Sequence, residues 1–168
     1  MSSIRIIYAS TGGHAKYVAN RLTEALIKAS ASSSVMIDTQ QASQSRRRDL
    51  IDADVLVLIS SEAQGEQHLN QNMHALLFDR AKDINLDGRW VACVSLSGDE
   101  ETAEILTKKF QEFIDAHNGR PFVSPLLLTG KDLYAYDKEM EQWADKLLTH
   151  VLHHLKPAHI RKKAGIPA

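Results

Sequence analysis

The stretch Ile4-Arg5-Ile6-Ile7-Tyr8-Ala9-Ser10-Thr11-Gly12-Gly13-His14-Ala15-Lys16-Tyr17-Val18-Ala19 joins an apolar run to a set of small and hydroxyl residues. The apolar run is rich in β-branched residues, which is typical of a buried strand. The two adjacent glycines allow a tight turn. An amphipathic pattern then predicts a helix with a core face made by Ala15, Val18, Ala19, Leu22 and Leu26. A strand that turns directly into a helix leaves the first N–H groups of that helix free, so the stretch predicts a phosphate-binding loop. A plain strand-to-helix turn is the alternative.

Beyond this unit the chain continues to alternate strands and helices. Further strands are predicted over 35–37, 54–59, 90–94 and 122–128. Helices are predicted over 42–50, from Leu69 to Leu77, from Ala103 to Ile114 ending at Asn118-Gly119, and over 136–155. The strand 54–59 is continuously apolar, as expected when helices cover both faces of a sheet. Five such units predict an α/β fold, a doubly wound five-stranded parallel sheet in the order 2-1-3-4-5. Pro125 in the fifth strand suits an edge position, where a missing donor is tolerated.

Size and composition indicate one ordinary globular domain. The chain has 168 residues, of which 43% are hydrophobic and 24% charged, and we expect a domain over 1–156 with a basic tail over 157–168. No apolar run approaches the roughly 18–20 residues that cross a bilayer. The single cysteine, Cys93, lies in an apolar run, so we expect a buried core residue, no disulfides and a cytoplasmic protein.

The charge and the histidines of the chain argue against a nucleic-acid partner and against a metal site. The formal net charge is −1, and the basic residues form two small clusters, Arg46-Arg47-Arg48 and His159-Ile160-Arg161-Lys162-Lys163. A nucleic-acid-binding face would need a patterned basic surface with aromatic partners, so no nucleic-acid partner is expected. The histidines lack the spacing and the partners of a metal site, and none is predicted.

Several nucleotide and phosphate motifs are absent. The sequence has neither a GxGxxG fingerprint nor a GxxxxGK[ST] loop after the first strand. A phosphoacceptor receiver domain would need carboxylates after the first and third strands, where this chain has Ser10 and Ser60. In the predicted sheet a ligand binds beyond the carboxyl ends of the strands, where the polar loops 10–14, 60–67 and 95–101 meet.

These three loops resemble those of the flavodoxin family. Thr11-Gly12 matches the centre of its phosphate loop, [ST]-x-T-G-x-T, although Ala9 and His14 replace hydroxyl residues. Ser60-Ser61 and Gly65-Glu66 match the loop after the third strand, and Gly98-Asp99 matches the loop after the fourth. Because no insertion splits the fifth strand, the chain is similar to the short-chain type.

The resemblance implies that the chain binds flavin mononucleotide (FMN) and carries electrons between a reductase and an acceptor protein. The implied FMN-binding residues are Ser10, Thr11, Gly12, Gly13, His14 and Ala15, then Ser60, Ser61, Glu62, Ala63, Gln64 and Gly65, and finally Ser95, Leu96, Ser97, Gly98 and Asp99. Two departures leave an alternative open. Glu62 stands where the family has a flavin-stacking aromatic residue, and no tyrosine follows Gly98-Asp99. The near-neutral charge also differs from the acidic family. A flavodoxin-like fold that has lost FMN and acts as a protein-binding or regulatory module is the second interpretation. Both a monomer and a homodimer stay open.

Overall fold

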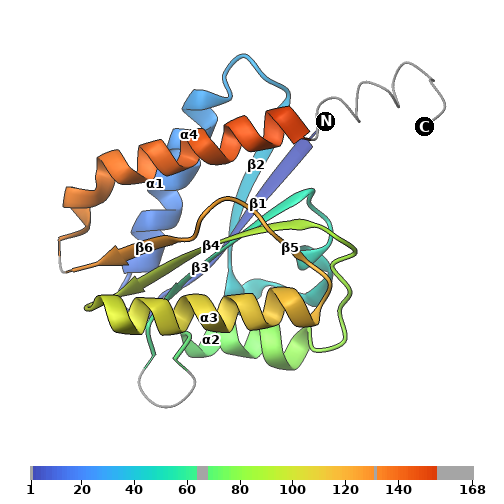
Figure 1. Ribbon diagram of the computed structural model, residues 1–168, viewed down its shortest axis with the longest axis vertical. Helices are drawn as coiled ribbons and strands as arrows, with labels where there is room; N and C mark the ends of the chain where they lie inside the picture. Colours follow the sequence, from blue (N-terminus) through green and yellow to red (C-terminus); the bar gives the residue numbers. More distant parts are fainter. Residues whose placement is uncertain (1, 64–67, 131, 155–168) are drawn as a thin grey trace.

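A parallel sheet forms the centre of the computed structural model, which describes residues 2–63, 68–130 and 132–154 (Figure 1). The strands are β1 Ser2–Ala9, β2 Val35–Gln41, β3 Val55–Ser61, β4 Trp90–Ser97, β5 Arg120–Pro121 and β6 Leu126–Thr129. Their order is β2-β1-β3-β4-β5, with β6 also paired to β4, and all pairs are parallel. The predicted strand order is confirmed.

Helices cover both faces of this sheet. On one face lie α1 His14–Ala29 and α4 Asp137–His154, and on the other lie α2 Gln71–His74 and α3 Glu100–Ala116 (Figure 1). A π-helical turn, η3 Ala75–Arg80, extends α2. Short 3-10 turns complete the fold: η1 Ala42–Gln44, η2 Arg47–Leu50 and η4 Leu133–Tyr136. In the described part of the chain, no helix has the length and apolar character needed to cross a bilayer.

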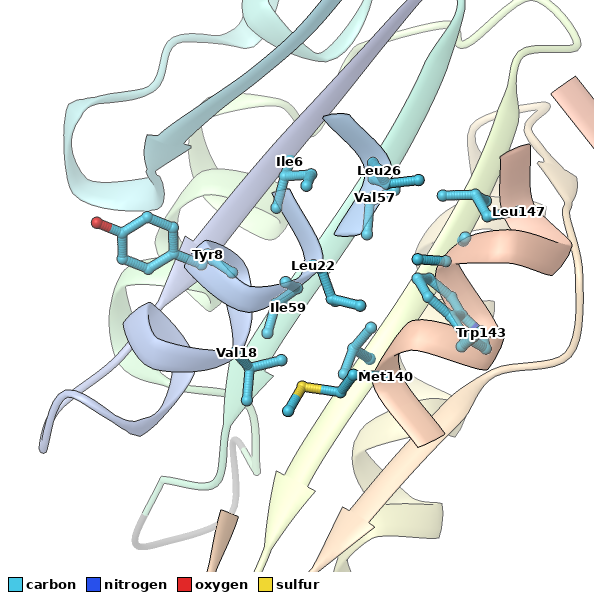
Figure 2. Packing of buried hydrophobic residues seen from close by; sticks show 14 of the residues in the cluster. Ile6, Tyr8, Val18, Leu22, Leu26, Val57, Ile59, Met140, Trp143 and Leu147 are labelled. Atoms are coloured by element: carbon cyan, nitrogen blue, oxygen red, sulfur yellow. The ribbon is translucent and has the colours of Figure 1, made fainter. Parts of the chain in front are cut away.

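The core has two layers because alternate strand residues point to opposite faces. Ile4 and Ile6 pack beneath α1 and α4, whereas Ile7 packs beneath α2 and α3. Figure 2 shows the first layer, where Leu22 of α1 and Trp143 of α4 approach the sheet from neighbouring helices. Burial of both faces explains the continuous apolar character of the central strands.

Several predicted strand boundaries are wrong. The strand predicted over 35–37 continues to Gln41 in register with β1. β3 and β4 continue to Ser61 and Ser97, beyond the predicted ends, and the hydroxyl groups of Ser60 and Ser95 find partners inside the protein. Within the predicted strand 122–128 only 126–128 are paired, as part of β6, and β5 precedes this range with four residues between the two strands. Val123 has a φ of +56° there, which breaks extended pairing before Pro125.

The predicted helices differ in detail as well. The segment 42–50 forms two 3-10 turns rather than one helix. The helix predicted from Leu69 begins at Gln71 and changes to π-helical geometry at Ala75. The apolar face expected for the helix after β4 is confirmed as buried, and it consists of Ala103, Leu106, Phe110, Phe113 and Ile114. The predicted basic tail, 157–168, lies outside the described residues.

Cys93 provides a chemical test of this core. It is buried on β4, and burial raises the pKa of its thiol from 9.0 to about 12. Because the thiolate is the reactive form, we expect Cys93 to resist a thiol reagent at pH 8 in the native protein and to react fully in guanidinium chloride. Equal labelling rates in the two states would contradict this burial.

The same shift predicts how stability depends on pH. The unfolded thiol releases its proton at a lower pH than the folded one, so the folded chain binds the proton more tightly. The contribution of Cys93 to stability is therefore complete below pH 9 and is lost as the pH rises through 9 towards 12. Denaturant unfolding at pH 8 and pH 10.5 measures this loss, and we expect a smaller loss in the control variant Cys93→Ala.

Candidate functional site

The carboxyl ends of three strands lie level with one another. Ala9 of β1 is in register with Ser60 of β3, and Ser60 is in register with Ser95 of β4. The segments that follow these residues therefore leave the same edge of the sheet. The structure brings the three predicted polar segments together at this edge, apart from residues 64–67, including the predicted Gln64 and Gly65, which lie outside the described residues.

The first segment is the turn from Ser10 to Gly13, which leads into α1. Gly13 precedes the helix with a φ of +84°, a left-handed conformation that glycine adopts without steric cost. Ser10 Oγ accepts a hydrogen bond of 3.1 Å from the Ala15 N–H, and the Tyr17 N–H begins the intrahelical series by donating to the Gly13 carbonyl. The geometry of a helix start leaves the N–H groups of Gly13, His14 and Lys16 for an external acceptor.

The outer surface of this turn is open. Thr11, Gly12, Gly13 and His14 are exposed. A Cβ atom built on Gly12 or Gly13 would meet no atom within 4 Å. The turn therefore leaves room for a ligand group beside the N-terminus of α1, where the helix dipole favours negative charge.

A cavity of about 390 Å³ lies next to this turn. Its lining residues are His14, Ser61, Glu62, Leu96, Ser97, Gly98, Leu128, Gly130 and Leu133. The leucines give it an apolar wall, and Glu62 and Ser97 form a polar rim in which Ser97 Oγ donates to Glu62 Oε2 at 2.6 Å. Ser61 Oγ is buried without a hydrogen-bond partner among the described residues. An apolar wall with a few polar groups is typical of sites for cofactors and other small molecules.

Asn70 connects the turn to the end of β3 and was not among the predicted residues. Its side chain is buried, and Nδ2 donates to Thr11 Oγ1 at 2.8 Å. Its backbone N–H bonds to Ser60 Oγ at 3.0 Å and to the Ser61 carbonyl at 3.1 Å. Its Oδ1 accepts from the Asn72 N–H and caps α2. An asparagine just before an apolar helical pattern is a recognisable cap signal, but its link to Thr11 has no local sequence signal.

Other predicted site residues have internal partners. Ser60 is fully buried against Asn70, and Ser95 is fully buried with its hydroxyl 2.9 Å from Thr107 Oγ1 of α3. The Asp99 carboxylate caps α3 by accepting from the Thr102 N–H and hydroxyl. The Ala63 N–H donates to the His68 carbonyl. These groups position the segments around the cavity and are not part of its wall.

Two further cavities adjoin the start of α1. One, of about 450 Å³, is lined by His14, Tyr17, Asp132, Leu133 and Tyr134, and so shares two residues with the cavity described above. The other, of about 110 Å³, lies on the β2 side and includes Lys16. The start of α1 is therefore hollowed on both sides.

The role of Asn70 can be measured through stability. We expect Asn70→Ala to lower the free energy of unfolding by about 1–3 kcal/mol, because it removes the cap of α2 and the donor to Thr11 from a buried position. Asn72→Ala, at an exposed position, is the control and should change stability by less than about 0.5 kcal/mol. Thr11→Val keeps the cap and removes the hydroxyl that accepts from Asn70 Nδ2. Wild-type stability in Thr11→Val would show that the bond to Thr11 contributes nothing.

No family model and no curated protein matches this sequence. Solved structures do match. The flavodoxin of Streptococcus pneumoniae TIGR4 is 17% identical with a TM-score of 0.75, and the match covers 89% of this chain and 100% of that one. Flavodoxin 1 of Bacillus cereus is 14% identical with a TM-score of 0.75, over 89% of this chain and 99% of that one. Rubredoxin oxygen:oxidoreductase of Desulfovibrio gigas is 12% identical with a TM-score of 0.73, over 90% of this chain but 36% of that one. The chain therefore has the fold of the short-chain flavodoxins.

Proposed function

We propose that the chain binds FMN at the carboxyl edge of its sheet and carries electrons between protein partners. One observation carries the proposal. At the start of α1, the N–H groups of Gly13, His14 and Lys16 have no acceptor among the described residues, and this turn lies beside a cavity of about 390 Å³ that has an apolar wall and a polar rim. A phosphate suits the first feature and a planar heteroaromatic ring suits the second.

The hydroxyl groups of the turn suit a phosphate. A hydroxyl has one proton to donate and two lone pairs that accept. Ser10 Oγ already accepts from the Ala15 N–H, and Thr11 Oγ1 accepts from Asn70 Nδ2. The hydroxyl protons of Ser10 and Thr11 therefore stay available for a phosphate oxygen. The side chains of His14 and Lys16, at the start of α1, are further hydrogen-bond donors for a phosphate.

The cavity suits the ring portion of the cofactor. Ser61 Oγ is a buried polar atom without a partner among residues 2–63, 68–130 and 132–154, and a buried hydroxyl is normally hydrogen-bonded. A ligand in the adjacent cavity could supply that partner. Leu96, Leu128 and Leu133 exclude water from one side of the cavity, while Glu62 places a carboxylate at its rim. Bound FMN supplies one- and two-electron chemistry, and this chain supplies the pocket and the local charge.

The partners follow from this role. An electron carrier needs a reductase and an acceptor protein, which we propose as its partners, and such encounters use small, transient interfaces. The exposed Gly98 at the mouth of the cavity leaves one end accessible to them. We also propose a cytoplasmic location, on the basis of the single, buried cysteine.

A specific observation supports the second candidate function. None of the described residues that line the cavity of about 390 Å³ is a phenylalanine, tyrosine or tryptophan. The formal net charge of −1 also gives little long-range attraction to a basic partner. A flavodoxin-like fold that has lost FMN and binds a protein partner fits both observations.

Titration with FMN distinguishes the two functions. We expect saturable binding of one FMN per chain, measured by visible absorbance and by flavin fluorescence. Gly12→Asp should weaken binding by about fivefold or more, since like charges about 4 Å apart repel by roughly 1–4 kcal/mol. Gly12→Asn is the matched neutral control, because a Cβ at this position meets nothing and the backbone there does not require glycine. We expect it to bind much more tightly than Gly12→Asp.

Two results would contradict the proposal. Wild-type protein that shows no change with FMN would favour the protein-binding function. Equal affinities in Gly12→Asp and Gly12→Asn would mean that the turn before α1 does not hold the phosphate.

A further inference from the structure

Tyr134 is an exposed aromatic residue beside the candidate site. Its exposed fraction is 74%, the highest among the large hydrophobic residues exposed in the described part of the chain, with Met36 at 61% and Ile27 at 54%. Single exposed apolar residues are common and need no explanation by themselves. Tyr134 differs from Met36 and Ile27 because it lines a cavity.

That cavity joins Tyr134 to the candidate cofactor site. Tyr134 lines the cavity of about 450 Å³ together with His14 and Leu133. His14 and Leu133 also line the cavity of about 390 Å³ at the ends of β3 and β4. The two hollows therefore meet along a shared wall, and a ligand in one lies next to the other.

The tyrosine is held in place at its base. Its backbone N–H donates to Asp132 Oδ1 at 3.1 Å, and the preceding Leu133 is buried in the core. Its ring makes an edge contact with Tyr17, with centroids 5.1 Å apart and an angle of 64° between the rings. Tyr17 is itself fixed by a hydrogen bond of 2.9 Å from its hydroxyl to Asp137 Oδ1. Much of the side-chain entropy that Tyr134 would lose on binding a ligand is therefore already lost in the free protein.

An ordered aromatic ring with exposed surface suits contact with another planar ring. Aromatic pairs favour offset-stacked or edge-to-face arrangements and contribute beyond the apolar area that they bury. We propose that Tyr134, on the segment after β6, makes the aromatic contact with the planar ring of a ligand that extends from the cavity of about 390 Å³, past His14 and Leu133, into the cavity of about 450 Å³. This inference rests on the proposed function, in which that ring is the isoalloxazine of FMN. It places the aromatic partner on a different segment from the loops after β3 and β4.

The test compares two substitutions of the same residue with wild-type protein. Tyr134→Phe keeps the ring, whereas Tyr134→Leu keeps apolar bulk without a ring. FMN is titrated into each protein, and both the dissociation constant and the fluorescence of bound FMN are measured. An electron-rich ring in contact with a flavin quenches its fluorescence. Denaturant unfolding verifies that the variants are folded.

We expect wild type and Tyr134→Phe to bind FMN with similar affinity, because both keep the ring. Only wild type should quench the fluorescence strongly, because a phenol is oxidised more easily than the ring of phenylalanine. Tyr134→Leu should bind about threefold to tenfold more weakly, which spans most of the range for an aromatic pair. Its bound FMN should be more fluorescent than that of wild type.

Three other outcomes would overturn the inference, and they show whether the proposed function fails with it. If wild type binds FMN and Tyr134→Leu matches it in affinity and fluorescence, Tyr134 is not the aromatic contact and the proposed function stands. If Tyr134→Phe binds FMN as weakly as Tyr134→Leu, the hydroxyl rather than the ring makes the contact, and the inference is wrong. If wild type does not bind FMN, the inference and the proposed function both fail.

Discussion

The lateral register of β1, β3 and β4 is the constraint on which the candidate site depends. Ala9, Ser60 and Ser95 lie side by side, so the chain leaves all three strands at one level. Both faces of these strands are buried, and a slip of one residue would move every side chain to the opposite face. The packing of the core therefore fixes the positions of the segments that surround the cavity.

Most polar side chains at these buried strand ends are paired, whereas Ser61 Oγ has no partner among the described residues. Ser95 bonds to Thr107 of α3, Ser60 bonds to the backbone of Asn70, and Ser97 bonds to Glu62. These hydrogen bonds connect different elements that meet at one edge. They hold the backbone of each segment, while the N–H groups of Gly13, His14 and Lys16 and the hydroxyl protons of Ser10 and Thr11 have no acceptor among the described residues. Some polar groups therefore hold the site together, and others are left to bind a ligand.

The sequence was sufficient to predict the architecture because the signals were local and repeated. Apolar strands alternate with amphipathic helices, and their order followed from right-handed crossovers. Some of the errors arise where polarity is equated with exposure. Ser60, Ser95 and Ser97 are polar and lie in the buried ends of strands, where their hydroxyl groups have hydrogen-bond partners.

The candidate site was predictable in outline but not in its supporting contacts. The turn Ser10–Gly13 and its position beside the loop after β3 follow from the motif and from the topology. The bond from Asn70 to Thr11 spans 59 positions of the sequence, and nothing in the local pattern of either residue indicates it. The place of Tyr134 beside His14 likewise depends on how α4 packs against α1. Such long-range contacts are consequences of packing and become visible only in three dimensions.

The break between β5 and β6 has a consequence for how folded chains meet one another. An unbroken edge strand presents a row of unpaired N–H and C=O groups, which can template the addition of a strand from another molecule. On this side of the sheet the edge consists of a two-residue and a four-residue piece, and Pro121 and Pro125 carry no N–H at all. The opposite edge, β2, has seven continuous residues. Strand addition by another chain is therefore disfavoured at β5 and β6, and β2 is the edge at which it would have to occur.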